Sequence, residues 1–188
     1  MILYPTETIY ALGVNALDDS ELAELFRLKG RDERQTVSWL VRNLDDIVQY
    51  AELSAVAKRV AERFLPGQVT LVLPAKETVP AGRAASDQTV GFRISSDKIA
   101  QGIIADFMQK YNAPLTCTSA NISGLPTQAD PETILKQFGD MSANIDTVYD
   151  DGPRTGMAST VVRIIGDQIT ILRTGSIAAH DIMAVVNS

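Results

Sequence analysis

The stretch STVVRIIGDQITILR, residues 159–173, decides the class of fold. It holds two runs rich in β-branched residues, Ser159–Ile165 and Gln168–Arg173, and both are typical of strands. Only Gly166 and Asp167 lie between them, which is the length of a tight hairpin turn. Two strands joined by such a turn run antiparallel. A sheet that contains this hairpin is therefore mixed rather than purely parallel.

Upstream of the hairpin, strand patterns alternate with helix patterns. Strands are expected over Met1–Tyr4, Ile9–Val14, Val37–Val41, Val69–Leu73, Thr89–Ile94, Pro114–Thr118 and Thr147–Tyr149. Helices are expected from Asp18 or Asp19 onward, from Ser54 to Phe64, around Ile99–Tyr111, over Glu132–Phe138 and over about 181–186. The chain has no internal repeat, low-complexity tract or Gly/Ser linker. We therefore predict one α/β domain over residues 1–188, a mixed parallel and antiparallel sheet with flanking helices.

Composition and charge exclude several classes of protein. Hydrophobic residues make up 45% and charged residues 21%, which are ordinary globular values. No apolar run reaches the roughly 18 residues of a membrane span. The N-terminal stretch lacks the features of a secretory signal, so we expect a cytoplasmic protein with no membrane contact. With one cysteine, Cys117, and one histidine, His180, the sequence excludes an internal disulfide and a metal site built from Cys or His.

The charge balance argues against stable binding to nucleic acid. Lys and Arg total 17 against 23 Asp and Glu, a formal net charge of -6. Proteins that hold nucleic acid through its phosphates usually carry a basic surplus. Weak or transient contact with nucleic acid is the most that this balance predicts, although a small basic pocket is compatible with it.

Polar residues gather at the ends of apolar runs. Two hydroxyls and a carboxylate stand in Pro5–Thr8, and two cations, Lys29 and Arg31, flank Gly30 at the end of a helix. Such a pair can bind phosphate, or it can simply stabilise the helix C-terminus through the dipole. Both interpretations stay open on spacing alone.

The segment Thr116–Asn121 leaves a strand with alternating hydroxyls and ends in an amide. It can present donors to an anion, or it can form a turn whose side chains satisfy their own backbone. Arg93 and Arg173 each end an apolar strand, where a charge either reaches water or points into a cleft. There is no phosphate-binding loop and no nucleophile elbow, and His180 is expected to be solvated.

Taken in order, these segments resemble the YrdC-like family, whose characterised enzymes are threonylcarbamoyl-AMP synthases. The matching segments are Tyr4–Gly13, Lys29–Arg31, Phe64–Thr70, Gly91–Arg93, Thr116–Gly124, Ala158–Val162 and Ile171–Arg173. Each motif is weak, but together they extend over nearly the whole chain. The resemblance implies a twisted mixed sheet of the DHBP synthase-like type with a concave cationic pocket.

The activity that the resemblance implies uses ATP with Mg²⁺, L-threonine and bicarbonate. An N-carboxy-threonine attacks the α-phosphate of ATP, pyrophosphate leaves, and threonylcarbamoyl-AMP results. A separate transferase then passes the threonylcarbamoyl group to N6 of adenosine 37 of tRNA. No side-chain nucleophile is needed. The Mg²⁺ is expected to arrive with ATP, with no metal ligand from protein side chains.

Carried onto matching positions, the family pattern implies a catalytic set of Lys29, Arg31, Ser119 and Asn121. ATP would contact these residues together with Thr116 and Arg173. Threonine would contact Thr8, Ser159 and Arg93, with Arg93 pairing its carboxylate.

Two positions and the N-terminal segment depart from the family pattern. Asp32 and Ser95 stand where the family commonly has proline, and the family usually carries a further helix ahead of Tyr4.

Two other functions stay open. One alternative is a non-catalytic module that binds RNA or a nucleotide in translation or ribosome assembly. Another is the carbamoyl-adenylate domain of hydrogenase maturation proteins, which normally belongs to a longer chain with zinc-finger cysteines.

Overall fold

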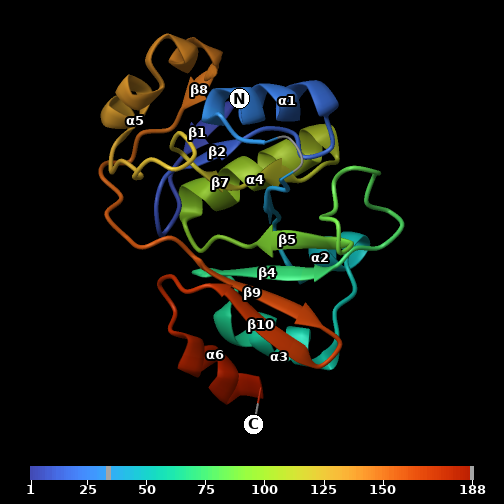
Figure 1. Cartoon of the computed structure of the whole chain (residues 1–188). Helices are drawn as coiled ribbons and strands as arrows, with labels where there is room; N and C mark the ends of the chain where they lie inside the picture. The colour runs from blue at the N-terminus through green and yellow to red at the C-terminus, as the bar shows by residue number, and fades with distance from the viewer. Residues whose placement is uncertain (33–34, 187–188) are drawn as a thin grey trace.

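The strands form two mixed sheets, a smaller one and a larger one (Figure 1). The computed structural model describes residues 1–32 and 35–186. The smaller sheet has the order β7-β2-β1-β8 and the larger has the order β10-β9-β4-β5-β3-β6. The strands are β1 (Ile2–Tyr4), β2 (Ala11–Gly13), β3 (Trp39–Leu40), β4 (Val69–Pro74), β5 (Thr89–Arg93), β6 (Leu115–Thr116), β7 (Thr118–Ser119), β8 (Thr147–Val148), β9 (Thr160–Ile165) and β10 (Gln168–Arg173).

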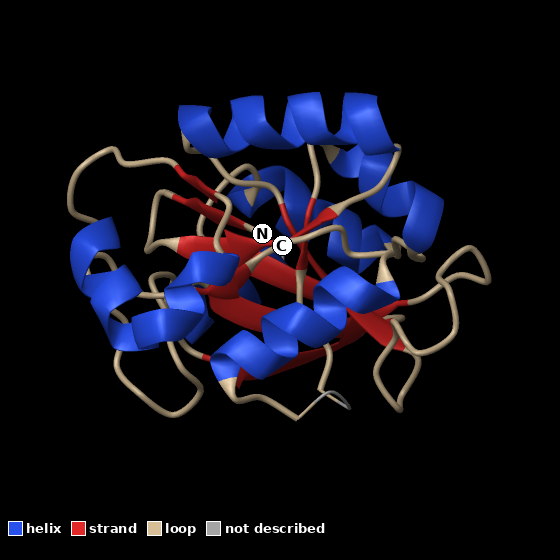
Figure 2. Ribbon diagram, turned by 90° about the horizontal axis from the view of Figure 1, so that it is seen from above, coloured by secondary structure: helices blue, strands red, loops and turns tan. Residues whose placement is uncertain are grey.

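Helices lie on both sides of the strands (Figure 2). They are α1 (Asp19–Lys29), α2 (Leu44–Tyr50), α3 (Ala55–Phe64), α4 (Lys98–Tyr111), α5 (Pro131–Phe138), the 3-10 helix η1 (Gly139–Asn144) and α6 (Ala179–Val186). Local sequence explains their ends. The Asp18 carboxylate accepts hydrogen bonds from the amides of Ser20 and Glu21, which caps α1. Gly30 then ends α1 in the left-handed conformation, with φ of 57°.

The mixed α/β architecture predicted from the sequence is confirmed. Strands β9 and β10 pair antiparallel across Gly166, as the hairpin pattern indicated. Short α2 was not predicted, because its seven residues carry too little apolar periodicity; an Asn43 side chain caps it. The expected single sheet is instead two sheets.

The predicted strand Pro114–Thr118 divides between the two sheets. Residues Leu115 and Thr116 pair with β3 of the larger sheet, whereas Thr118 and Ser119 pair with β2 of the smaller one. Cys117 is the crossing point. The chain thus changes sheets within one short segment, and it brings a polar strand end to the junction.

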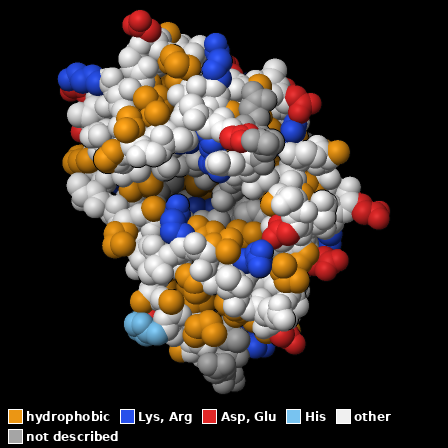
Figure 3. Space-filling view, in the orientation of Figure 1, with side chains coloured by type: hydrophobic (Ala, Val, Ile, Leu, Met, Phe, Trp, Pro, Cys, Tyr) orange, Lys and Arg blue, Asp and Glu red, His pale blue; other side chains and the backbone are white. Residues whose placement is uncertain are grey.

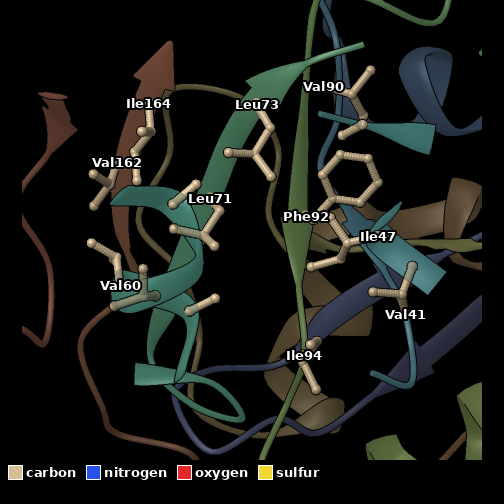
Figure 4. Close-up of a cluster of buried hydrophobic side chains, with 14 of the residues drawn as sticks. Val41, Ile47, Val60, Leu71, Leu73, Val90, Phe92, Ile94, Val162 and Ile164 are labelled. Atoms are coloured by element: carbon tan, nitrogen blue, oxygen red, sulfur yellow. The ribbon is translucent and has the colours of Figure 1, made fainter. Parts of the chain in front are cut away.

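The main hydrophobic core lies against the larger sheet (Figure 4). Leu71, Phe92 and Val162 come from adjacent strands, and Val60 of α3 and Ile47 of α2 cover them. All five are essentially fully buried. Burial of each such side chain contributes about 1.5–3 kcal/mol. This core fixes the relative positions of β4, β5 and β9, whose ends carry polar residues into the site.

Candidate functional site

A cleft of about 190 Å³ lies at the junction of the two sheets. Its lining comes from both sheets and from segments far apart in the chain. The lining residues are 6 and 9–11 before and in β2, 31 and 36–38 after α1, 70 in β4, 93 in β5, 117–119 where the chain changes sheets, 158, 159 and 161 around β9, and 173 in β10. Arg31, Arg93 and Arg173 are all in this lining, and none of its described residues is Asp or Glu. Figure 3, in the orientation of Figure 1, shows a hollow in the surface with Lys or Arg side chains beside it. Such a lining attracts an anion.

Strand topology explains why Arg93 and Arg173 lie at the same edge of the larger sheet. Strand β5 is antiparallel to β4, β9 is parallel to β4, and β10 is antiparallel to β9. Strands β5 and β10 therefore run in the same direction. Because Arg93 and Arg173 are the last residues of these strands, both lie at the same edge of the sheet.

Arg93 is held by a network that leaves part of its guanidinium unused. Its Nη2 donates to Glu7 Oε1 at 2.8 Å and to Thr8 Oγ1 at 2.6 Å. Only 5% of Arg93 is exposed, and its Nε is buried without a hydrogen-bond partner. Glu7 also accepts a hydrogen bond from Ser95 Oγ. A buried donor without a partner is costly, which makes Arg93 a candidate functional residue rather than one kept for stability.

The other two arginines are oriented by backbone carbonyls. Arg31 Nη2 donates to the Thr36 carbonyl at 2.6 Å, and Arg31 Nε donates to Gln35 Oε1 at 3.0 Å. Arg173 Nη2 donates to the Ser159 carbonyl at 2.8 Å. Burial lowers the pKa of Arg31, and burial followed by the charge of Arg93 lowers the pKa of Arg173. Crowded, partly desolvated cations of this kind favour an anionic ligand.

Ser119 lines the cleft from the start of a loop that is braced by hydrogen bonds. Its Oγ donates to Asn121 Oδ1 at 2.5 Å. The Asn121 amide donates in turn to the carbonyls of Ile122 at 3.0 Å and Leu125 at 2.6 Å. Ser119 thus lines the cleft with its hydroxyl proton directed to Asn121, while the Asn121 side chain is bonded to its own loop.

Comparison with known proteins identifies the chain. A model built on Sua5, YciO and YrdC proteins, described as telomere recombination, matches residues 1–175. The chain belongs to the Sua5/YciO/YrdC family.

Relatives in this family carry informative names. The threonylcarbamoyl-AMP synthases of Pyrococcus abyssi and Bacillus subtilis are each 31% identical, over 99% of this chain and 53% of their own length. The crystal structure of P. abyssi Sua5 complexed with L-threonine superposes with a TM-score of 0.85 at 31% identity, over 98% of this chain and 53% of that one. Escherichia coli YciO gives a TM-score of 0.80 at 26% identity, over 93% and 82%. The chain spans about half the length of the two synthases.

Not every residue expected from the Sua5/YciO/YrdC pattern reaches the cleft. Arg31, Arg93, Ser119, Ser159 and Arg173 line it. Four residues are not among those that line it: Thr8, Lys29, Thr116 and Asn121.

Thr8 and Thr116 are both buried and bonded within the protein. The Thr8 hydroxyl accepts a hydrogen bond from Arg93 Nη2 and so orients the guanidinium. The Thr116 hydroxyl accepts from the Val14 amide at 3.0 Å and donates to the Leu12 carbonyl at 3.3 Å. The position of Thr116 therefore supports a structural role, and its contact with nucleotide stays a prediction.

The cleft also contains polar residues that were not predicted individually as site residues. Thr6, Cys117 and Thr118 line it, and they lie inside the polar segments Pro5–Thr8 and Thr116–Asn121. Tyr10 and Ser38 line it as well, and an extension of the first segment by two residues could have found Tyr10. Cys117 and Thr118 reach the cleft only because their strand changes sheets.

The two departures from the family pattern have simple structural outcomes. Ser95 donates a hydrogen bond to Glu7 and so joins the network around Arg93. Asp32 is exposed and is not among the residues that line the cleft. His180 is exposed as expected, with 83% of its side chain accessible.

Among the described residues, no group of three or more His, Cys, Asp or Glu side chains could hold a metal ion. No helix in the same part of the chain is long and apolar enough to cross a membrane.

Proposed function

We propose that this chain carries the site of a threonylcarbamoyl-AMP synthase. The observation that carries the proposal is the cleft with three arginines and no carboxylate in its described lining. It stands in a fold shared with relatives named threonylcarbamoyl-AMP synthase and with a Sua5 structure complexed with L-threonine. Both proposed substrates, ATP and threonine, bring anionic groups that such a lining would attract.

The proposed reaction makes one carbamate and one phosphoric–carbamic anhydride. The amine of L-threonine and bicarbonate condense to N-carboxy-threonine with loss of water. A carboxylate oxygen of this carbamate attacks the α-phosphorus of ATP, the bond from that phosphorus to the bridging oxygen breaks, and pyrophosphate leaves. The enzyme class is then nucleotidyltransferase. Because an anion attacks an anionic phosphate, the site must supply cations and preorganised donors rather than a nucleophile.

The residues divide by position into two groups. Arg93, which lines the cleft, is proposed to pair with the threonine carboxylate, with Thr8 fixing the guanidinium and Ser159 in the same lining. Arg31, Ser119 and Arg173 are proposed to meet the phosphates and the nucleotide. Asn121 would act through the Ser119 hydroxyl that it accepts from.

Mg²⁺ is proposed to enter as the complex with ATP. Mg²⁺ prefers carboxylate, phosphate and water oxygens. None of the described residues that line the cleft offers a carboxylate, so the phosphates and water would supply its ligands. The ion would neutralise charge on the departing pyrophosphate.

The product is proposed to serve a separate transferase that modifies N6 of adenosine 37 in tRNA. The net charge of -6 suits a chain that makes a small intermediate and touches tRNA weakly at most. The cytoplasmic location predicted from the sequence stays a prediction.

Pyrophosphate release tests the proposal directly. The protein is incubated with Mg²⁺ and ATP, and L-threonine and bicarbonate are each omitted in turn, with mass detection of the adenylate. Release that requires both co-substrates, together with the mass of threonylcarbamoyl-AMP, is the expected result. Folded protein that binds ATP but releases no pyrophosphate would overturn the synthase and favour a binding module. Release with carbamoyl phosphate in place of threonine would indicate a carbamoyl-adenylate enzyme.

A further inference from the structure

The side chain of Lys29 is enclosed by the loop that begins at Ser119. Lys29 is the last residue of α1 and is only 2% exposed. Its Nζ donates to the backbone carbonyl of Asn121 at 2.8 Å and also to the backbone carbonyl of Ser119. Its own carbonyl accepts from the Ser123 amide at 2.8 Å. Both the backbone and the side chain of Lys29 are therefore tied to the same loop.

This placement separates Lys29 from Arg31, its partner in the Lys-x-Arg pattern. Arg31 lies two residues further on, beyond the left-handed turn at Gly30, and it lines the cleft. Lys29 does not line the cleft, and two of its three ammonium protons are directed to carbonyls. The turn at Gly30 lies between the two cations, so Arg31 lines the cleft while Lys29 is enclosed by the loop.

The bonded carbonyls bear on the geometry of the site. Carbonyl groups of Ser119 and Asn121 accept from the ammonium, and Ser119 is also one of the residues that line the cleft. The Ser119 carbonyl also accepts from the Asn121 backbone amide at 3.0 Å. Loss of the charged donor is costly for both buried carbonyls, so the loop would rearrange to find water or another partner. Such a rearrangement would move Ser119 Oγ, whose present direction is fixed by Asn121 Oδ1.

We infer that Lys29 is a positioning residue, which acts on the reaction through the loop of residues 119–125 and contacts no phosphate. The part of this inference that concerns turnover rests on the proposed function. The part that concerns the loop stands on the hydrogen bonds alone.

A double-mutant cycle on kcat/KM for ATP separates the two roles. Lys29→Met and Ser119→Ala are each expected to lower kcat/KM at least about tenfold. If Lys29 acts through Ser119, kcat/KM of the double variant is no more than about threefold below that of the less active single variant. A double loss equal to the product of the single losses, about a hundredfold or more, would mean independent contacts with substrate and would overturn the inference.

Hydrogen exchange provides a readout that needs no turnover. Lys29→Met is expected to lower protection of the Ser123 and Leu125 amides at least tenfold, because both lie in the loop that the ammonium anchors. Lys136→Met is the matched control, since that side chain is 70% exposed and its ammonium pairs with Glu132 on the same helix. Unchanged protection in Lys29→Met would overturn the inference.

The unaltered protein gives a third measurement, which covers a variant that fails to fold. The ¹⁵N signal of the Lys29 amine is followed as Mg²⁺ and ATP are added. A positioning role predicts a signal that keeps its place, and a large shift specific to ATP would contradict it. If wild-type protein releases no pyrophosphate, the proposed function fails while the exchange and ¹⁵N results still decide the role of Lys29.

Discussion

Arg93 Nη2 donates a hydrogen bond of 2.6 Å to Thr8 Oγ1, and the Nε of the same guanidinium has no partner. The hydroxyl, together with the Glu7 carboxylate, fixes one edge of the guanidinium. Both acceptors engage Nη2, and neither engages Nη1. A guanidinium held in this way keeps its charge and its orientation in the lining of the cleft, which suits an anionic carboxylate.

Arg93→Lys is therefore expected to raise the KM for threonine at least about tenfold while changing the KM for ATP less than threefold. Lysine keeps a charge near Glu7 but loses the planar fork. Steady-state kinetics with each substrate varied in turn measure both values. Equal changes in the two KM values would remove Arg93 from the threonine site.

Arg31→Ala is expected to lower kcat/KM for ATP by about 10² or more without unfolding the protein. The side chain lines the cleft and is held by Gln35 and the Thr36 carbonyl rather than by the core. Arg27→Ala is the matched control, one turn earlier on α1 with a side chain that is 66% exposed. Turnover that is equal in the two variants would contradict the assignment of Arg31.

Stability should rise with pH through the titration of Lys29. Burial, and then the charge of Arg31, lower the pKa of Lys29 from 10.5 to about 7. Between these pH values the unfolded chain binds a proton at Lys29 that the folded chain does not bind. The free energy of unfolding of wild type therefore rises, relative to that of Lys29→Met, by up to about 1.4 kcal/mol per pH unit above pH 7. Urea unfolding at pH 6, 7, 8 and 9 measures the difference, and parallel curves for the two proteins would refute the prediction.

Gly156→Ala is expected to cost about 1–3 kcal/mol of stability and to raise the threonine requirement. A Cβ on Gly156 would stand 2.6 Å from the Thr8 carbonyl oxygen and 3.2 Å from its Cα, so the backbone of one segment must move. Movement of Thr8 would disturb Arg93.

Gly102→Ala is the control for this substitution, because nothing lies within 4 Å of its would-be Cβ in α4. That change should stabilise the protein by about 0.5–1 kcal/mol through helix propensity. Thermal unfolding and threonine KM of the two variants are compared with wild type. Similar behaviour of both glycine variants would show that the contact between residues 156 and 8 has no consequence.

Short-range features of the fold were predictable because their causes are short-range. The cap at Asp18, the end of α1 at Gly30 and the hairpin at Gly166 each depend on residues within a few positions of one another. The mixed character of the sheets follows from that hairpin. Short α2 escaped prediction, because its stability comes from packing Ile47 and Tyr50 on the core rather than from its own pattern.

The candidate site was predictable as a set of residues but not as an arrangement. Sequence alone determined that cations and hydroxyls stand at strand and helix ends, since apolar runs and their interruptions are visible in the chain. Tertiary structure alone decided which of them share a cleft. Strand directions place Arg93 and Arg173 at the same edge of the larger sheet. The change of sheets at Cys117 places Thr118 in the cleft. The turn at Gly30 separates Arg31, which lines the cleft, from Lys29, which is bonded to the loop. These outcomes depend on strand pairing between segments far apart in the chain, which no local pattern encodes.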